Sequence, residues 1–256
     1  MVEPVIEFND VSKAFRRADG RGDLLAVEGL SLEVARGEIV AVVGKTGCGK
    51  STMFNLIAGL IEPSSGEVVV GGHDPFRDFD FFRGKVGIVF QGDRLMPWRT
   101  ALANVLLGLE ILDTEPAKAQ VVARGWLERL GLSGHENDYP HALSGGMRQR
   151  VSIARAFAVE PELLLCDEPF SSLDEMTARD LRAEFVRLVR QNGKTAVFIT
   201  HQIGEAMAIG DRVLVLHRPA RIAFEARMDQ AAGEVARQQL HAKILEVLAL
   251  EAPVGG

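Results

Sequence analysis

The stretch "GKTGCGKST" at residues 44–52 matches the phosphate-binding pattern G-x-x-x-x-G-K-[ST]. It follows the apolar run 38–44 and opens a helical pattern, which is the context in which backbone N–H groups can surround phosphate oxygens. Lys50 is expected to neutralise the β- and γ-phosphates of a nucleotide, and the Ser51 hydroxyl to bind Mg²⁺. A glycine-rich turn that binds nothing is the alternative.

The loop glycines are expected to let the backbone approach the phosphates because they carry no Cβ. Cys48 fits the loop as a small residue and is assigned no chemistry of its own. The residues expected to bind the nucleotide in this loop are Gly44, Lys45, Thr46, Gly47, Cys48, Gly49, Lys50, Ser51 and Thr52.

Two adjacent carboxylates, Asp167 and Glu168, end the apolar run in "LLLCDEP". Unpaired charges at the end of a buried strand are costly, so a metal ion and a water molecule are the expected partners. Asp167 fits the role of Mg²⁺ holder, and Glu168 that of the base that orients water for attack on the γ-phosphate. A plain strand end followed by a helix cap is the other interpretation.

Polar residues also follow two further apolar runs: Gln91 after 86–90 and His201 after 196–200. In open α/β sheets ligands bind at the carboxyl ends of the strands, so these side chains could converge with the carboxylates on one site. Phosphoryl transfer needs groups that orient water and stabilise charge on the γ-phosphate, and both residues could serve in catalysis. In isolation, a polar residue after a strand is usually just the start of a loop.

The elements that position these residues alternate between strand and helix. Apolar runs without alternation predict buried parallel strands at 38–44, 86–90, 163–166, 196–200 and 212–217. Helical patterns occupy 50–60, 145–158 and 174–191. The fold class is therefore α/β, with a mainly parallel sheet as its core.

Two segments depart from this alternation. Near the N-terminus, "VIEFNDV" and "LSLEVARG" alternate apolar and polar residues, which predicts an antiparallel β layer beside the main sheet. Residues 100–132 hold two helix-like stretches without a strand between them, which predicts an inserted helical subdomain.

The amino-acid composition limits the classes of protein to which the chain can belong. The chain has 256 residues, 47% of them hydrophobic and 25% charged, as expected for one globular domain. Its net charge of −6 gives no basic surface, so nucleic acid is not an expected partner. The longest uncharged apolar run, "MFNLIAGLI", is half of what a membrane span needs, and the N-terminus lacks a signal-peptide pattern. With only two cysteines, the chain is expected to be cytoplasmic.

A second anion site is predicted at "LSGGMRQR", residues 143–150. Apolar residues at helical spacing place a helix start near Gly145, with Ser144 as its cap. The N-terminus of a helix attracts anions. A plain capped helix with a flexible glycine start would explain the same residues.

Taken together, "GKTGCGKST", Gln91, "LSGGMRQR", "LLLCDEP", "SSLD" and His201 resemble the ATP-binding-cassette (ABC) ATPase family in order and spacing. The resemblance covers about residues 5–222, and "LSGG" is the signature of that family. It implies a phosphate-loop NTPase fold in a single ABC ATPase domain, 1–256. Its expected parts are a core of about 1–91 and 158–222, a helical subdomain of about 92–157 and a C-terminal helical tail of about 223–256.

The resemblance further implies that ATP and Mg²⁺ are the cofactors and that two copies face each other head to tail. It assigns each remaining site residue a role. ATP would lie between the phosphate loop of one copy and Ser144, Gly145 and Gly146 of the other. Asp174 would lie at the dimer interface, His201 at the γ-phosphate, and Gln91 at the metal and water. Phe15 would stack on adenine, although packing within the protein is an equal alternative.

Within the family, residues 91–110 and 167–182 resemble the ATPase subunits of nitrate, sulfonate and taurine-type importers. This implies integral membrane permease subunits and an extracytoplasmic solute-binding protein as partners, with the chain peripheral on the cytoplasmic side of the inner membrane. Residues 95–98, "LMPW", would then line the groove that receives a cytoplasmic helix of the permease. Gly92 departs from the acidic residue expected at its position.

Other members of the family stay open as alternatives. An ATPase of a lipid-handling or export system would share every catalytic motif. A non-transport ABC protein would need a second cassette, a coiled coil or a basic surface, and a small-molecule kinase would have no use for "LSGG". The tail after residue 222 has the pattern of an amphipathic helix and could serve dimerisation or regulation.

Overall fold

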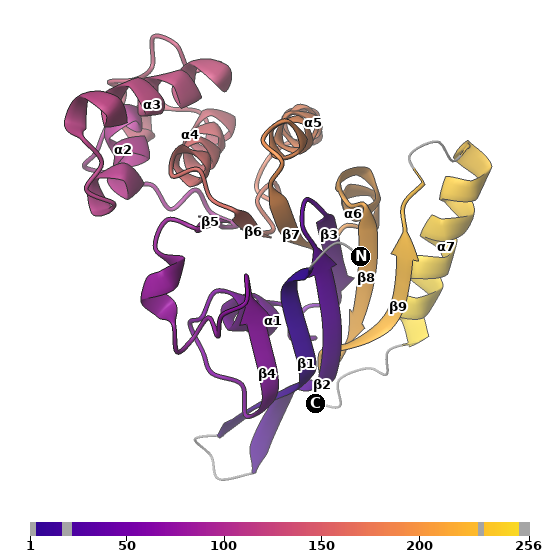
Figure 1. The fold of residues 1–256 in the computed structure, drawn as a ribbon. Coiled ribbons are helices and arrows are strands. Elements are labelled where there is room, and N and C mark those ends of the chain that lie inside the picture. The colour runs from indigo at the N-terminus through magenta and orange to yellow at the C-terminus, as the bar shows by residue number, and fades with distance from the viewer. Residues whose placement is uncertain (1–3, 17–21, 230–232, 251–256) are drawn as a thin grey trace. The chain divides into compact units, whose positions relative to one another are not determined.

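The computed structural model describes residues 4–16, 22–229 and 233–250 (Figure 1). Its strands are β1 (Pro4–Arg16), β2 (Asp23–Ala35), β3 (Ile39–Gly44), β4 (Ser65–Val70), β5 (Val86–Val89), β6 (Leu163–Asp167), β7 (Thr195–Thr200), β8 (Arg212–His217) and β9 (Arg221–Arg227). Its α-helices are α1 (Lys50–Ile57), α2 (Ala101–Ile111), α3 (Pro116–Arg129), α4 (Gly145–Ala158), α5 (Glu175–Gln191), α6 (Ile203–Ile209) and α7 (Glu234–Leu250). Two 3₁₀ turns cover Phe79–Phe82 and Pro140–Ala142.

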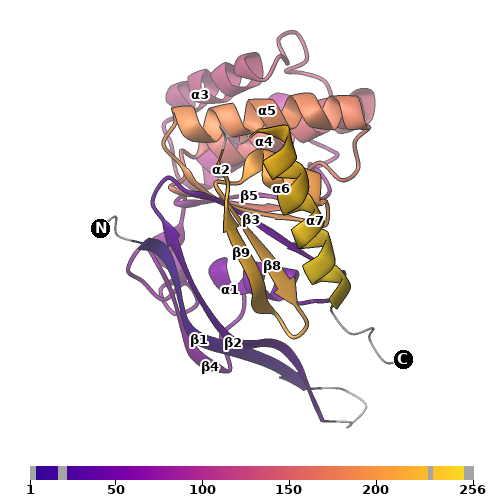
Figure 2. The same ribbon diagram turned by 90° about the vertical axis from the view of Figure 1, so that its right-hand side faces the viewer.

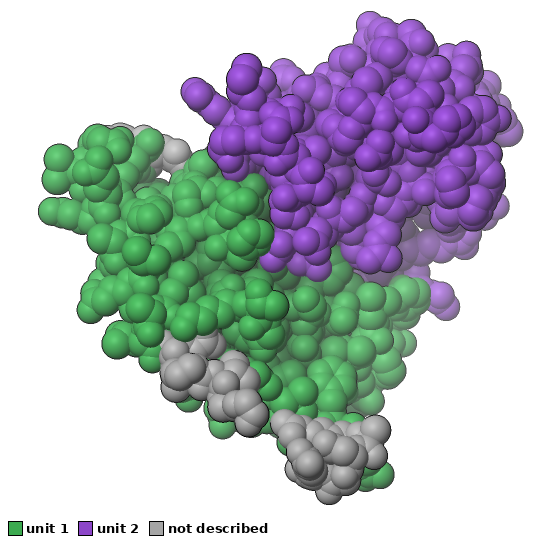
Figure 3. Space-filling view, turned by 180° about the vertical axis from the view of Figure 1, so that it is seen from behind, with its two compact units in different colours: residues 1–79, 195–256 green, residues 80–194 purple. Residues whose placement is uncertain are grey.

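The chain divides into two compact units (Figure 3). Unit 1 consists of residues 1–79 and 195–256, and unit 2 of residues 80–194.

Unit 1 contains strands in the order β7-β3-β8-β9. β7, β3 and β8 are parallel, whereas β9 pairs antiparallel with β8. Every residue of β3 and of β7 is buried, as the unbroken apolar runs predict. The carboxyl end of β3 leads directly into the phosphate loop.

A second sheet of unit 1 has the order β2-β1-β4 and is antiparallel throughout, which confirms the expected N-terminal β layer. α1 contacts β2, β3 and β4, and Figure 2 shows it between this layer and the strands of the parallel sheet. The phosphate loop at the start of α1 is therefore held by both sheets.

The opposite face of the parallel strands is covered by α6 and α7. Ala41 and Val43 of β3 share a buried apolar cluster with Ile203 of α6 and with Ile244 and Val247 of α7. Because side chains alternate along a strand, the neighbouring residues of β3 point to the other side of the sheet. The C-terminal helix is thus part of the core of unit 1.

Unit 2 combines the parallel pair β5-β6 with the helices α2 to α5. Its core includes a row of aromatic contacts in which Phe157 of α4 lies 5.0 Å from Trp126 and 6.1 Å from Phe185 between ring centroids. Truncating such a buried ring typically costs about 3–5 kcal/mol. α2 and α3 confirm the two helices expected in residues 100–132, and α4 has the predicted bounds.

Two expectations need correction. α1 ends at Ile57 and not near residue 60, because Gly59 takes a positive φ of 67° and ends the helix. Residues 223–227, expected in a helical tail, belong to strand β9, where side chains alternate in exposure beside β8. The helix of the tail is α7, and residues 230–232 and 251–256 of the expected tail lie outside the described part.

Candidate functional site

The phosphate loop of unit 1 wraps around the amino group of Lys50. Lys50 is 93% buried, with a relative exposure of 7%. Its Nζ donates to the backbone oxygens of Gly44 at 2.6 Å and Lys45 at 3.0 Å. Lys45, Thr46 and Gly47 are exposed, so the outer side of the loop is open. The first N–H groups of a helix have no partner inside it, and those of α1 are therefore directed at this loop.

Glycine is required at several loop positions for different reasons. A Cβ on Gly49 would lie 2.4 Å from the backbone oxygen of Ala26, and its φ is +108°. A Cβ on Gly44 would lie 2.5 Å from Sγ of the buried Cys48. Gly47 has open space around it and is required only by its φ of +79°. The loop is thus a close-fitting backbone cradle, of the kind that phosphate oxygens occupy.

His201 follows β7 at the same edge of the sheet as the phosphate loop. Thr200 pairs with Val43, the residue before Gly44, so His201 and the loop leave neighbouring strands at the same level. The Thr200 hydroxyl donates to the buried carboxylate of Glu205 and accepts from the N–H of Gln202 at 3.0 Å. These contacts fix the backbone on both sides of the exposed His201. No local sequence pattern points to Thr200 or Glu205.

Phe15 lies on β1, where it pairs with Leu24 of β2. Its side chain is 39% exposed, and Nζ of Lys13 lies 5.3 Å from the ring centroid. An exposed ring next to a cation can accept another flat ring by stacking. The Phe15 ring is thus partly packed against the protein and partly open.

In unit 2, Gln91, Asp167 and Glu168 leave the parallel pair β5-β6 at the same end. Val89 pairs with Cys166, so the residues that follow both strands emerge together at the carboxyl edge. Glu168 has a φ of +45°, which is uncommon for a residue with a side chain and typical of functional turns. The hydroxyl of Ser171 donates to the Glu168 backbone oxygen at 3.0 Å and holds this turn.

The cysteine beside the carboxylates takes no part in this chemistry. Complete burial, together with the negative charge of Asp167, raises the pKa of the Cys166 thiol. The thiol therefore stays protonated at neutral pH, and nucleophilic chemistry at this sulfur is disfavoured.

The second predicted anion site is the start of α4. Ser144 caps the helix, its Oγ accepting from the N–H of Met147 at 3.3 Å, as the sequence predicts. A Cβ on Gly146 would lie 2.8 Å from Cγ2 of Thr177, so glycine allows the first turns of α4 and α5 to pack closely. Ser144 and Gly145 remain exposed. An exposed helix start without an acidic residue in its first turn suits an anion.

Asp174 caps α5 beside this helix start. Its carboxylate accepts from the N–H of Thr177 at 3.0 Å, and this hydrogen bond lowers the pKa of Asp174 below its ordinary value. The side chain is exposed and ionised at neutral pH.

Two arginines of α4, neither of them expected from the sequence to belong to the site, hydrogen-bond the segment after Gln91. Arg148 Nε donates to the Asp93 carboxylate at 2.8 Å. Arg155 donates to the backbone oxygens of Asp93 at 2.9 Å and Arg94 at 2.8 Å. The arginines occupy helix positions that the sequence presents as ordinary surface residues, so no local pattern reveals their partners.

The expected site residues thus form two groups. Unit 1 places His201 at the edge that carries the phosphate loop, with Phe15 on its β1 strand. Unit 2 places Gln91, Asp167 and Glu168 at one strand edge, and Ser144, Gly145, Gly146 and Asp174 at two adjoining helix starts. Over the described ranges, no cluster of three or more His, Cys, Asp and Glu side chains could hold a metal ion by itself. Within those ranges there is also no helix long and apolar enough to cross a membrane.

Comparison with known proteins places these features in a family. The ABC transporter family model matches residues 27–171. The aliphatic sulfonates import ATP-binding protein SsuB 1 of Burkholderia cenocepacia is 40% identical over 229 residues, which are 87% of this chain and 64% of that protein. The nitrate import ATP-binding protein NrtC of Synechococcus elongatus is 39% identical over 202 residues, 77% of this chain and 30% of that protein.

Among solved structures, a dimeric post-hydrolysis state of an ATP-binding cassette bound to ADP and Pi has a TM-score of 0.76 and 32% identity. The match covers 88% of this chain and 99% of that one. The α/β architecture of the phosphate-loop NTPases is thereby confirmed. This chain belongs to the ABC transporter family and is an ATP-binding-cassette ATPase.

Proposed function

We propose that the chain is the ATP-hydrolysing subunit of a membrane importer for a small anionic solute, working through a head-to-tail dimer gated by ATP. The observation that carries the proposal is the presence of two helix starts suited to phosphate, the glycine-rich loop at α1 and the exposed start of α4. One nucleotide per chain leaves the second helix start for the nucleotide of another copy.

Each residue of the site has its own role in ATP hydrolysis. Residues 44–52, with Lys50 at their centre, bind the phosphates of ATP. Ser51 and Asp167 would hold Mg²⁺, which would neutralise phosphate charge, and Gln91 would orient water beside it. Glu168 accepts a proton from the attacking water, and its φ of +45° defines the turn that follows β6. His201 hydrogen-bonds the γ-phosphate, and Phe15 stacks on adenine.

The residues at the starts of α4 and α5 make the dimer contacts in this proposal. Ser144, Gly145 and Gly146 of one copy donate to the γ-phosphate held by the other copy, and Asp174 lies at the interface beside them. The relative of known structure is described as a dimer bound to ADP and Pi, which supports this arrangement. Loss of the γ-phosphate removes contacts from both copies, so hydrolysis opens the dimer.

The solute class rests on the relatives whose names give nitrate and aliphatic sulfonates as imported molecules. Permease subunits would anchor the chain to the cytoplasmic side of the inner membrane, and a solute-binding protein would deliver the anion. Trp98 is 72% exposed, and it is the side chain we assign to the permease contact. Leu95, which the sequence also suggested for this groove, is 91% buried and packs inside unit 2.

Purification of the tagged protein from its own membranes in mild detergent tests the proposal. Recovery of a polytopic membrane protein is the expected result, and Trp98→Asp should reduce its recovery. Leu250→Asp is the matched control, because Leu250 is also 72% exposed but lies on α7. Recovery of soluble partners alone would overturn the importer assignment, and recovery of a lipid exporter would correct the direction of transport.

A further inference from the structure

A surface pocket of about 520 Å³ lies within unit 2, between α3 and the C-terminal ends of α4 and α5. Its volume is in the range of small-molecule sites in proteins, about 300–1,000 Å³. None of the residues that we assign to ATP, to the dimer or to the permease lines it. Its lining comes from α3, from the end of α4 and from the segments that follow α4 and α5: Val121, Val122, Gly125, Trp126, Arg129, Phe157, Glu160, Asn192 and Lys194.

The pocket has room beside Gly125, and the packing of the chain does not explain this glycine. Gly125 lies inside α3, where glycine is less favourable than alanine. A Cβ on Gly125 would meet nothing within 4 Å. By contrast, a Cβ on Gly108, the glycine inside α2, would lie 2.6 Å from Cγ1 of Val159. Close packing therefore accounts for Gly108, whereas an open binding site accounts for Gly125.

The walls next to Gly125 are largely apolar. Trp126 and Phe157 are both buried, and their ring centroids lie 5.0 Å apart, so the core of unit 2 holds this part of the pocket in place. Val121 lies one turn before Gly125 on α3 and is 72% exposed. Apolar surface at the pocket thus remains for a ligand to cover.

Three charged side chains line the pocket, and among the described residues none of them has an ion-pair partner. The guanidinium of Arg129 lies over the Trp126 ring, 5.0 Å from its centroid. Nζ of Lys194 donates to the backbone oxygen of Glu160 at 3.4 Å, which is a long hydrogen bond. Two cations and the Glu160 carboxylate give the lining a net charge of +1, which favours a ligand with one negative charge.

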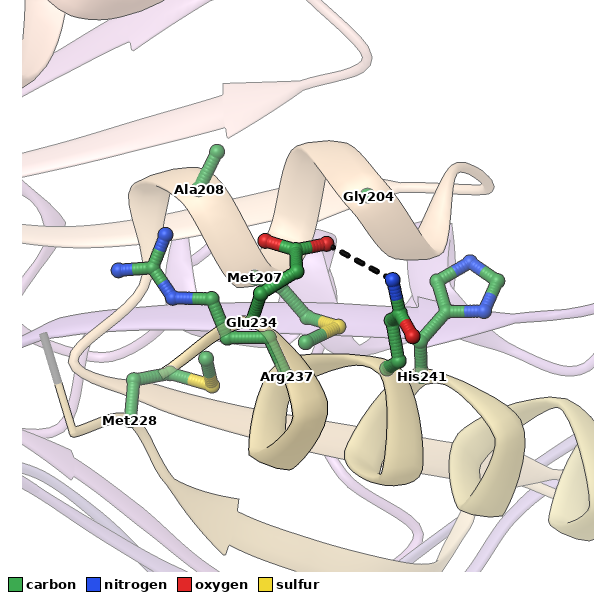
Figure 4. A pocket seen from close by; sticks show the side chains of 8 residues that line it. Gly204, Met207, Ala208, Met228, Glu234, Arg237 and His241 are labelled. Atoms are coloured by element: carbon green, nitrogen blue, oxygen red, sulfur yellow. Dashed lines mark hydrogen bonds between the residues drawn. The ribbon is translucent and has the colours of Figure 1, made fainter. Parts of the chain in front are cut away.

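The pocket between α6 and α7 of unit 1 differs in this respect (Figure 4). There the Glu234 carboxylate accepts from the amide of Gln238 at 3.1 Å, and Arg237 also has an interaction partner. The charged groups of that pocket are thus engaged already, whereas Arg129 of unit 2 is available to an anion.

We infer that the pocket of unit 2 binds an organic monocarboxylate with a flat apolar ring. The carboxylate pairs with Arg129, because a guanidinium presents two parallel N–H donors that match its two oxygens. Lys194 adds attraction through its charge. The ring lies against Val121 and approaches the backbone of α3 at Gly125, where no side chain is in the way. The inference depends on unit 2 alone and stands whether or not the importer function is correct.

Calorimetric titration of the full chain with 1-naphthylacetate, at saturating Mg²⁺-ADP to occupy the phosphate loop, tests the inference. 1-Naphthylacetamide has the same ring without the charge, and acetate has the charge without the ring. 1-Naphthylacetate is expected to bind at least about tenfold more tightly than either, a difference of about 1.4 kcal/mol. No binding of 1-naphthylacetate, or equal affinity for it and either of the other two, would overturn the site.

A charge variant tests the contact with the carboxylate. Arg129→Gln should weaken binding of 1-naphthylacetate about tenfold or more, in line with the loss of a hydrogen bond between charged groups. Arg124→Gln is the matched control, because it removes a cation from the same helix at an exposed residue that does not line the pocket. It should leave the affinity unchanged.

A second variant tests the place of the ring. Gly125→Leu puts a side chain into the open space and should abolish binding of 1-naphthylacetate. The melting temperature without ligand should be retained or raised, because leucine is more favourable than glycine inside a helix. Unchanged affinity in either Arg129→Gln or Gly125→Leu would place 1-naphthylacetate elsewhere and overturn the inference.

Discussion

Single residues of the phosphate loop differ in what they contribute. Gly49 is required by its φ of +108° and by the backbone of Ala26, whereas Gly47 is required by its φ of +79° alone. Lys50 is required for charge, and its two backbone hydrogen bonds keep it inside the loop. The pattern G-x-x-x-x-G-K-[ST] specifies Gly49 and leaves residue 47 open, whereas in the structure both glycines have a positive φ and only Gly49 also has backbone within contact of a Cβ.

Replacement of Gly49 and of Gly47 by alanine should lower the stability of the protein by different amounts. Gly49→Ala should lower the free energy of unfolding by several kcal/mol, because strain of about 1–3 kcal/mol is joined by a clash with backbone. Gly47→Ala should lower the free energy of unfolding only by the backbone strain of its positive φ, since nothing lies within 4 Å of the new Cβ. Urea unfolding of both variants measures the difference. Equal losses of unfolding free energy in the two variants would mean that the close approach of the Ala26 backbone does not destabilise Gly49→Ala.

Lys50→Ala should weaken ATP binding by about tenfold to a hundredfold, which corresponds to the 1.5–3 kcal/mol of a hydrogen bond to a charged group. Displacement of a fluorescent nucleotide measures the change. Lys243→Ala removes an exposed lysine that pairs with Glu246 on α7 and serves as the control. Unchanged nucleotide affinity in Lys50→Ala would contradict the role given to the phosphate loop.

At the scale of elements, the site is built from strand ends and helix starts. Local chemistry sets the helix starts, because Thr100, Ser144 and Asp174 each accept from a backbone N–H of the first turn. The cap and the bounds of α4 could therefore be predicted from the sequence, whereas Asp174 was expected inside a helix over 174–191 and is in fact the cap of α5. Unbroken apolar runs likewise predict β3, β7 and β8.

Other features depend on contacts between distant residues and could not be predicted. Strand β9 exists because β8 offers it an edge, while its own sequence continues into a helical pattern. The arginines that hold Asp93 are 55 and 62 residues away from it along the chain. Gly59 is the exception, since a glycine near a helix end is a local signal that the expected bounds of α1 overlooked.

The Asp174 cap predicts a pH dependence of stability. The hydrogen bond from Thr177 lowers the pKa of Asp174 in the folded state. Its stabilisation is therefore present above the ordinary aspartate pKa, about 3.9, and is lost as the pH falls through the lowered folded-state value. Asp174→Asn keeps a capping group that does not titrate, so its free energy of unfolding should fall less on acidification than that of the unaltered protein. Identical pH profiles in chemical unfolding would contradict this role.

At the scale of the whole molecule, the chain has two helix starts suited to phosphate, and one nucleotide would use one of them. α1 starts with a closed cradle around Lys50, whereas α4 starts with an exposed Ser144 and Gly145. In the dimer that we propose, the second site becomes complete only when another copy brings a nucleotide to it. This coupling would convert ATP binding and hydrolysis into closure and opening of a dimer that a permease can follow.

Light scattering of Glu168→Gln with and without Mg²⁺-ATP tests this claim most directly. The variant should bind ATP without turnover and change from monomer to dimer when ATP is added, and the double variant with Ser144→Arg should stay monomeric. Ser133→Arg is the matched control, since Ser133 is exposed in the same unit but lies outside α4, and it should leave the dimer intact. An ATP-dependent dimer that persists with Ser144→Arg would contradict the head-to-tail site.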